Sequence, residues 1–389
     1  MPKLGVLWGR NHSIKRACIF LLVTAAFLEI GLRFLLPENS PGLLFQMERV
    51  ADFQALPWAE PWNREHDELR RTFQPYELYR LEEHKGELIN VSPDGYRLTK
   101  NASAVSRAKI GIFGGSTLWG SFARDEHTIA SELSLALNQT RPMDSAEVGN
   151  FGEVGFVFSQ DLHRAIRLRY SGGPSRNDFP QTLIFFGGVN DALAAISNFV
   201  HGIDTPAGLP WENQKYRDLF RLGDTGEVAW SDFLWKFKTV RTFVNVFDLH
   251  LFHKWRAKGQ QRPLRQEDYL RISDEVSEKY VHIMVSVNEL LKNLELRVIF
   301  VLQPILAHKA DKTSGEKQVF DKNIEWQNYL KLTFDKIRAE ALQERHKAKF
   351  VDLSALFANT KQLMFYDAIH YSEEGNKVIG ERLADALLR

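Results

Sequence analysis

The sequence contains almost no cysteine: Cys18 is the single thiol among 389 residues. One cysteine excludes a disulfide framework within the chain and a metal site built from several cysteines. The sequence also lacks a dominant charge, because 50 Lys and Arg residues are balanced by 49 Asp and Glu residues. Nucleic-acid-binding domains are usually strongly basic, so a net charge of +1 gives no reason to expect a nucleic-acid partner.

Internal repeats and low-complexity segments are absent as well. Hydrophobic residues make up 44% of the chain and charged residues 25%, proportions that are typical of a folded globular protein. At 389 residues the chain can form one large domain or two modest ones around a sizeable core.

One long apolar run is present, ACIFLLVTAAFLEIGLRFLL at residues 17–36. It has about the 20 residues that a helix needs to cross a bilayer. Basic residues precede it, so the positive-inside rule predicts a cytoplasmic tail at 1–16, a membrane anchor at 17–36 and the remaining chain outside the cytoplasm, which is the periplasm in a Gram-negative cell. Two alternatives stay open: a cleaved signal peptide, with Thr24 and Ala26 near the cut, or a buried helix of a soluble protein.

Residues 37–105 are rich in proline, tryptophan and charge. LPENSPG opens this stretch as a linker does, and VSPDGYRL at 91–98 contains the turn sequence Pro-Asp-Gly. We therefore interpret residues 37–105 as a linker and N-terminal extension, followed by a folded domain at residues 106–389.

From residue 109 onward, apolar strand-like segments alternate with amphipathic helical segments. This alternation predicts a parallel sheet that is covered by helices on both faces. The expected strands are 109–114, 181–188, 297–305 and 349–354, and the expected helices are 127–138, 273–294, about 317–345 and 374–388.

Residues 198–268 interrupt this alternation with an insertion rich in tryptophan and phenylalanine. An insertion between two strands of an open α/β sheet emerges beside the crevice at the carboxyl ends of the strands, where such sheets bind ligands. Two interpretations stay open for it: additional hydrophobic core for a long connection, or a lid or wall over a substrate.

The segment KIGIFGGSTLWGSF at 109–122 joins an apolar strand to a Gly-Gly-Ser-Thr turn. A phosphate-binding P-loop needs a lysine after its glycines, and a dinucleotide-binding turn needs the spacing G-x-G-x-x-G. The segment has neither feature, so phosphate binding is not expected. The turn then either exposes Ser116 as a nucleophile or is an ordinary connection from strand to helix.

A serine nucleophile needs a base to accept its proton and a third group to orient that base. YDAIHYSEEG, before the last helix, contains Asp367 and His370. At this spacing a turn lets the carboxylate reach one imidazole nitrogen while the other nitrogen faces outward. His308, which follows the strand at 297–305, is an alternative base, because the end of that strand can reach the same edge of the sheet.

Acyl transfer also needs hydrogen-bond donors for the negative oxygen that develops during the reaction. GNFGEVGF at 149–156 is a glycine-rich loop that can offer a backbone N–H, and FFGGVND at 185–191 contains Asn190, whose amide is a donor. Each segment falls at the carboxyl end of an expected strand or in the loop after it. In a parallel sheet these ends share one edge, so the segments are expected to meet.

In chain order, these four segments resemble the sequence blocks of the SGNH/GDSL hydrolase superfamily. FGGSTLWG is similar to the Gly-Gly-Ser-Thr form of the serine block, in which Gly115 stands where Gly-Asp-Ser-Leu members have an acid. NFGEVG has the spacing Asn-x-x-x-x-Gly, and GVND and DAIH match the last two blocks. The resemblance covers about residues 105–389, and the matching positions in the last three blocks are Asn150, Gly155, Asn190, Asp367 and His370.

The resemblance implies a three-layer α/β/α sandwich with a flavodoxin-like parallel sheet of about five strands. It implies Ser116 as nucleophile, His370 as general base and acid, and Asp367 as the carboxylate that orients His370. The oxyanion hole then comprises the backbone N–H groups of Ser116 and Gly155 and the side chain of Asn190.

The function implied is that of a serine esterase, which acts through an acyl-Ser116 intermediate and needs no metal or organic cofactor. The expected substrate is an acylated small molecule or polysaccharide, including O-acetyl groups of an envelope or secreted polysaccharide. Two alternatives stay open: an O-acyltransferase that uses the same residues, and a catalytically inactive carbohydrate-binding or assembly protein.

Overall fold

The computed structural model describes residues 49–100, 108–140, 146–170, 179–200, 264–292 and 294–388, together with Thr24. Apart from Thr24, these residues belong to one unit of the chain, formed by residues 45–214 and 261–389. Apart from Thr24, the expected anchor at 17–36 lies outside the described residues, and so does most of the insertion at 198–268. Across the part of the chain that is described, no helix is both long enough and apolar enough to cross a membrane.

A parallel sheet forms the centre of this unit, with the strand order β6-β5-β7-β8-β9. In order along the chain the strands therefore lie as 2-1-3-4-5, which is the flavodoxin-like arrangement. The predicted α/β fold with a parallel sheet of five strands is confirmed. The strands are β5 (Ala108–Gly114), β6 (Ala146–Asn150), β7 (Thr182–Gly187), β8 (Arg297–Leu302) and β9 (Lys349–Asp352).

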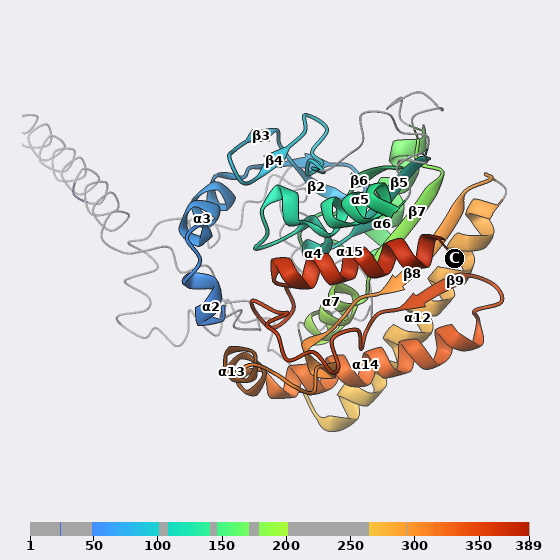
Figure 1. Ribbon diagram of the computed structural model, residues 1–389. Helices are drawn as coiled ribbons and strands as arrows, with labels where there is room; N and C mark the ends of the chain where they lie inside the picture. The colour runs from blue at the N-terminus through green and yellow to red at the C-terminus, as the bar shows by residue number, and fades with distance from the viewer. Residues whose placement is uncertain are drawn as a thin grey trace, which may run out of the picture. The chain divides into compact units, whose positions relative to one another are not determined.

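Helices follow the strands and pack on both faces of the sheet. In Figure 1, α15 lies in front of the sheet and next to α5, and these two helices contact each other extensively. The described helices of these layers include α5 (Ile129–Thr140), α6 (Phe158–Tyr170), α7 (Val189–Val200), α12 (Gln266–Lys292), α14 (Ile324–Gln343) and α15 (Glu373–Leu388).

The central strands β5, β7 and β8 supply side chains to two hydrophobic cores, because successive side chains of a strand point to opposite faces. Ile112, Ile184 and Ile299 pack on one face with residues of α5 and α15. Phe113, Phe185 and Phe300 pack on the other face with residues of α6 and α12. Packing on both faces explains why the central strands are continuous apolar runs, the pattern from which burial on both faces was predicted.

The prediction of one helix at about 317–345 is wrong, because the structure has two helices there, α13 (Ser314–Lys322) and α14 (Ile324–Gln343). The break falls at Asn323, whose φ of −117° and ψ of 25° are not helical. Its side-chain Nδ2 donates to the carbonyl oxygen of Val319 at 2.9 Å. Asparagine competes for backbone hydrogen bonds in this way, and so it often ends helices.

In the extension before the sheet, the described residues 49–100 form two helices and four short strands. Trp62 anchors it, because its buried Nε1 donates to the carbonyl oxygen of Ala123 at 2.9 Å. Arg97 anchors it again through a buried ion pair with Asp125, with 3.0 Å between Nε and Oδ1. The elements are α2 (Ala51–Gln54), α3 (Ala59–Glu68), β1 (Arg71–Gln74), β2 (Leu78–Leu81), β3 (His84–Lys85) and β4 (Asn90–Val91).

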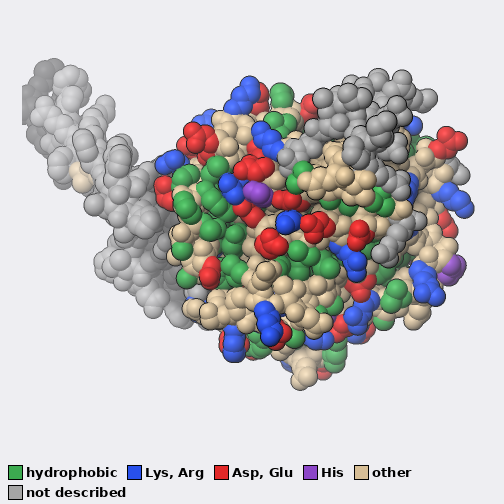
Figure 2. All heavy atoms as spheres, in the orientation of Figure 1, with side chains coloured by type: hydrophobic (Ala, Val, Ile, Leu, Met, Phe, Trp, Pro, Cys, Tyr) green, Lys and Arg blue, Asp and Glu red, His purple; other side chains and the backbone are tan. Residues whose placement is uncertain are grey.

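Charges of both signs are interspersed over the described surface that Figure 2 shows. On the exposed side of the helices they form pairs one turn apart, such as Lys317 with Asp321 and Lys331 with Asp335. Pairs of this kind each contribute only about 0.3–0.5 kcal/mol, so the fold depends mainly on the two cores.

Candidate active site

Ser116 lies at the carboxyl end of β5, where the chain leaves the sheet and enters the short helix α4 (Ser116–Trp119). The glycine that ends the strand permits this sharp turn. A Cβ on Gly114 would lie 2.2 Å from the carbonyl oxygen of Phe186 on the neighbouring strand β7. Any side chain at this position would therefore push the serine turn away from the sheet.

A chain of hydrogen bonds links Ser116 to His370 and Asp367. Nε2 of His370 lies 2.8 Å from Oγ of Ser116, and Nδ1 of His370 lies 2.7 Å from Oδ2 of Asp367. All three side chains are buried, with exposed fractions of 6% for Ser116, 5% for His370 and 0% for Asp367. A hydroxyl, an imidazole and a carboxylate in this order can transfer the hydroxyl proton to the ring.

The carboxyl group of Asp367 is held in its ionised form. Burial raises its pKa, but the attraction of His370 and hydrogen bonds from His370 and Ile369 outweigh burial, so the pKa of Asp367 lies below its usual value of 3.8. Oδ1 accepts from the backbone N–H groups of Ile369 at 2.8 Å and His370 at 2.7 Å. An ionised Oδ2 favours the tautomer of a neutral His370 ring that carries its proton on Nδ1, and in that tautomer Nε2 can accept the hydroxyl proton of Ser116.

Phe122 supports the ring of His370 from the side. The two ring centroids are 5.2 Å apart and the ring planes meet at 89°. The backbone of Phe122 has a φ of 64°, which is unfavourable for a residue other than glycine. Strain of this kind persists where surrounding contacts impose it, and it is common at functional sites. The sequence analysis did not identify Phe122, because no local motif marks an aromatic residue that packs against a distant histidine.

The glycine-rich loop after β6 is tied to the serine turn. Nδ2 of Asn150 donates to the carbonyl oxygen of Leu118 at 3.2 Å, and Oδ1 of Asn150 accepts from the backbone N–H of Gly152 at 3.1 Å. The backbone N–H of Glu153 donates to the carbonyl oxygen of Gly114 at 2.9 Å. Asn150 therefore holds the glycine-rich loop against α4, and the loop is close enough to act together with Ser116.

Asn190 and Gly155 lie on adjoining segments of this edge of the sheet. Nδ2 of Asn190 donates to the carbonyl oxygen of Phe156 at 2.7 Å, and a Cβ on Gly115 would lie 2.2 Å from the same Nδ2. Among the described residues, none accepts the second N–H of this amide. Gly155 has a φ of 83°, in the left-handed region that favours glycine.

A recess with an empty volume of about 290 Å³, which includes space open to solvent, adjoins Asn190. Two buried carboxyl groups that the sequence analysis did not identify, Asp161 and Asp191, line it. Burial raises the pKa of Asp191 to about 6. Burial and the neighbouring charge of Asp191 raise the pKa of Asp161 well above its usual value.

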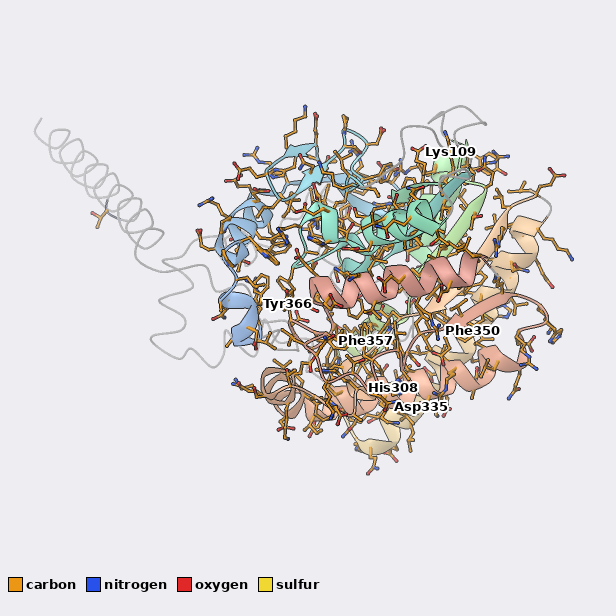
Figure 3. All side chains as sticks on the ribbon, in the orientation of Figure 1. Lys109, His308, Asp335, Phe350, Phe357 and Tyr366 are labelled. Atoms are coloured by element: carbon orange, nitrogen blue, oxygen red, sulfur yellow. The ribbon has the colours of Figure 1, made fainter. Side chains whose placement is uncertain are left out.

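His308, the alternative base, lies at a different place. It ends the short helix η4 (Leu306–His308), and its Nε2 lies 3.2 Å from Oδ1 of Asp335 on α14. Its Nδ1 lies 3.2 Å from the carbonyl oxygen of Ser354. Figure 3 shows His308 and Asp335 together and apart from Tyr366, the residue before Asp367. The partners of His308 are thus not those of His370.

Within the described ranges of the chain, no three His, Cys, Asp or Glu side chains are grouped so that they could hold a metal ion.

The sequence matches no family model and no curated protein. Among solved structures, the chain is similar to LAE5, an α/β hydrolase from the metagenome of Lake Arreo in Spain, with 14% identity over 73% of this chain and 98% of that chain and a TM-score of 0.34. It is also similar to Axe2, an acetylxylan esterase from Geobacillus stearothermophilus, with 15% identity over 73% of this chain and 94% of that chain and a TM-score of 0.33. A protein assigned to the G-D-S-L lipolytic family from Desulfitobacterium hafniense has 16% identity over 72% of this chain and 99% of that chain, with a TM-score of 0.32.

Proposed function

We propose that this chain is a serine esterase that hydrolyses ester-linked acyl groups through an acyl-Ser116 intermediate. The observation that carries the proposal is the hydrogen-bonded chain from Ser116 through His370 to Asp367. It lies at the carboxyl end of a strand in a parallel sheet, where open α/β folds bind their ligands.

In the proposed reaction, Nε2 of His370 takes the hydroxyl proton of Ser116 while Oγ attacks the carbonyl carbon of the ester. The bond between this carbon and the leaving oxygen then breaks, and His370 gives the proton to the departing alcohol. Water next attacks the acyl-Ser116 ester with His370 again as the base. Breakage of the bond to Oγ releases the carboxylic acid and restores the serine hydroxyl.

We assign the stabilisation of the negative oxygen to three donors: the backbone N–H groups of Ser116 and Gly155 and the amide of Asn190. Support comes from the position of Asn190 beside Gly115 and from its second amide N–H, which no described residue accepts. Donors that are fixed before the reaction stabilise the transition state without reorganisation.

We propose a short acyl group, such as acetyl on an envelope or secreted polysaccharide, as the substrate. The small exposed fractions of Ser116 and His370, 6% and 5%, favour a short acyl group over a long chain. The aromatic-rich sequence of residues 198–268 is suited by its composition to contact with a sugar ring or with an acyl chain.

The test of this function uses the full-length protein in three assays. A fluorophosphonate probe should label it, it should hydrolyse an acetyl ester faster than an octanoyl ester, and sugar acceptors should not become acylated. Acylated sugar in the products would instead indicate an O-acyltransferase. Absence of both labelling and ester turnover would contradict the proposal and favour an inactive carbohydrate-binding protein.

Replacement of Asn190 by alanine should lower kcat by roughly 10²- to 10³-fold and leave KM nearly unchanged, which is the effect of a lost oxyanion donor. Gly115→Ala should cause a similar loss without removing the amide, because the new Cβ would lie 2.2 Å from Nδ2 of Asn190. Steady-state kinetics on both variants measure this. A rise in KM alone would indicate that Asn190 binds the substrate and does not stabilise the transition state.

We further propose that residues 17–36 anchor the protein and that residues 37–389 lie outside the cytoplasm, on the evidence of the apolar run and the basic residues before it. A reporter that is active only outside the cytoplasm should work when it is fused after Arg389, and the fusion should sediment with membranes. A soluble mature form that begins near Phe27 would show a cleaved signal peptide and overturn the anchor.

A further inference from the structure

The N-terminal extension contains a hairpin that contacts the glycine-rich loop. In this hairpin β1 pairs with β2 in antiparallel register. Tyr79 on β2 donates its hydroxyl hydrogen to the carbonyl oxygen of Val154 at 2.7 Å. Its ring packs against Phe156, with centroids 5.5 Å apart and planes at 67°. Tyr79 therefore contacts the residues on both sides of Gly155.

The hydrogen bond from Tyr79 reaches the peptide unit that Gly155 shares with Val154. A trans peptide is planar, so its C=O and N–H groups point in opposite directions, and the described residues contain no cis peptide bond. With the carbonyl of Val154 directed at Tyr79, the N–H of Gly155 points away from the hairpin. A donor on the carbonyl also polarises the amide, which makes the N–H on its other side a stronger donor.

Gly155 is shaped to fit this contact. Its φ of 83° disfavours a side chain, and a Cβ there would lie 2.8 Å from the hydroxyl oxygen of Tyr79. The close approach of Tyr79 and the left-handed backbone thus require glycine for two separate reasons.

Buried polar contacts hold the hairpin in place. Glu77, which is 1% exposed, accepts a hydrogen bond from Nε of Arg164 at 2.8 Å, and its carboxylate also pairs with Arg167. Tyr76 and Leu78, on either side of Glu77, have φ values of 66° and 76°, which are strained for these residues. The ion pairs of Glu77 impose this backbone, and the backbone fixes the direction in which β2 presents Tyr79.

A second link joins β2 to the same loop. Oε2 of Glu153 accepts from the backbone N–H of Leu81 at 3.2 Å and lies 3.5 Å from Nη2 of Arg164. Oε1 of Glu153 accepts from the backbone N–H of Val154 at 3.1 Å. The carboxylate of Glu153 therefore connects the hairpin to the residue whose carbonyl Tyr79 contacts.

We propose that Tyr79 is a positioning residue of the oxyanion site: its hydroxyl orients and polarises the Val154–Gly155 peptide so that the N–H of Gly155 stabilises the negative oxygen. The inference rests on the proposed esterase function. If Tyr79 has this role, the N-terminal extension is part of the catalytic unit, although it lies outside the region of family resemblance.

The test is Tyr79→Phe in the full-length protein, which removes one hydroxyl and keeps the ring against Phe156. We expect kcat to fall by roughly tenfold, the effect of one lost hydrogen bond, with KM within about twofold of wild type. The inhibition constant of a simple alkylboronic acid, which forms a tetrahedral adduct on serine, should rise by the same factor. A role in folding alone would not change kcat and boronic acid binding together.

Tyr76→Phe is the matched control. It makes the same chemical change in the same hairpin, but Tyr76 is 79% exposed and stacks on His163, with centroids 6.1 Å apart. Its kcat should match that of wild type. If wild type is active and Tyr79→Phe keeps both kcat and boronic acid affinity, the proposal for Tyr79 is wrong while the esterase function stands. If wild type has neither labelling nor turnover, the esterase function itself fails.

A second variant covers the case in which Tyr79→Phe does not fold. Incorporation of 3-fluorotyrosine at position 79 keeps the ring and the hydroxyl but makes the hydroxyl a stronger acid and a stronger donor. Below the pH at which this phenol ionises, kcat should rise and boronic acid binding should tighten. Unchanged values in a folded 3-fluorotyrosine protein would overturn the proposal.

Discussion

The full-length Ser116→Ala protein should lose ester turnover by at least about 10⁴-fold and should no longer react with a fluorophosphonate probe. The variant keeps His370 and the hydrogen-bond donors but has no atom that can form the acyl intermediate. Among the described residues, the one partner of this Oγ is Nε2 of His370 at 2.8 Å, so the fold should survive its loss. Labelling, ester kinetics and a thermal unfolding curve measure the three expectations.

Ser121→Ala is the control for this variant. Ser121 is also buried, at 8% exposed, and lies in the same turn, where its backbone N–H donates to the carbonyl oxygen of Ser116 at 3.0 Å. Loss of its hydroxyl should leave labelling and turnover close to wild type. Turnover that persists in Ser116→Ala would mean that another residue is the nucleophile, and the proposed mechanism would be wrong.

The sheet could be predicted because its central strands are continuous apolar runs. KIGIFG, TLIFFG and RVIFVL are buried on both faces, so hydrophobicity alone marks them as β5, β7 and β8. The strand AEVGN, which is β6, is shorter and alternates buried with partly exposed residues, so it gives a weaker signal. The break at Asn323 was missed because the apolar periodicity continues across it into α14.

The candidate site could be predicted as four local segments, but not as an assembled geometry. Ser116 and His370 are 254 positions apart, and only the strand order brings their segments to one edge of the sheet. Phe122 and Tyr79 were not predicted, because each acts by packing or hydrogen bonding to a residue distant in sequence. Such contacts follow from the packing of the whole domain and leave no spacing pattern in the chain.

Replacement of Asp367 by asparagine should lower kcat by about 10⁴-fold, the effect of presenting the wrong histidine tautomer to the serine. Oδ1 accepts from the N–H groups of Ile369 and His370, so an asparagine would keep its oxygen there and turn its NH₂ toward Nδ1 of His370. An NH₂ donor at Nδ1 places the ring proton on Nε2, which then cannot accept the proton of Ser116. Pre-steady-state kinetics should show a slow acylation step with KM little changed.

The same substitution should change how stability depends on pH. The pKa of Asp367 in the folded protein lies below its usual value of 3.8. A carboxyl group of this kind contributes stability above its unfolded pKa of about 3.9 and loses that contribution as pH falls through the folded pKa. The difference in unfolding temperature between wild type and Asp367→Asn should therefore be largest above about pH 5 and shrink in stronger acid.

Asp335→Asn provides the matched comparison, because Asp335 also pairs with a histidine, His308, with 3.2 Å between Oδ1 and Nε2. Among the described residues, no serine hydroxyl contacts His308 in the way that Ser116 contacts His370, so substitution of Asp335 should leave kcat near the wild-type value. The assignment of the base is wrong if Asp335→Asn and His308→Ala abolish turnover while Asp367→Asn and His370→Ala retain it. If turnover is lost only in Asp367→Asn and His370→Ala, the base of the reaction is the imidazole of His370, which faces Ser116.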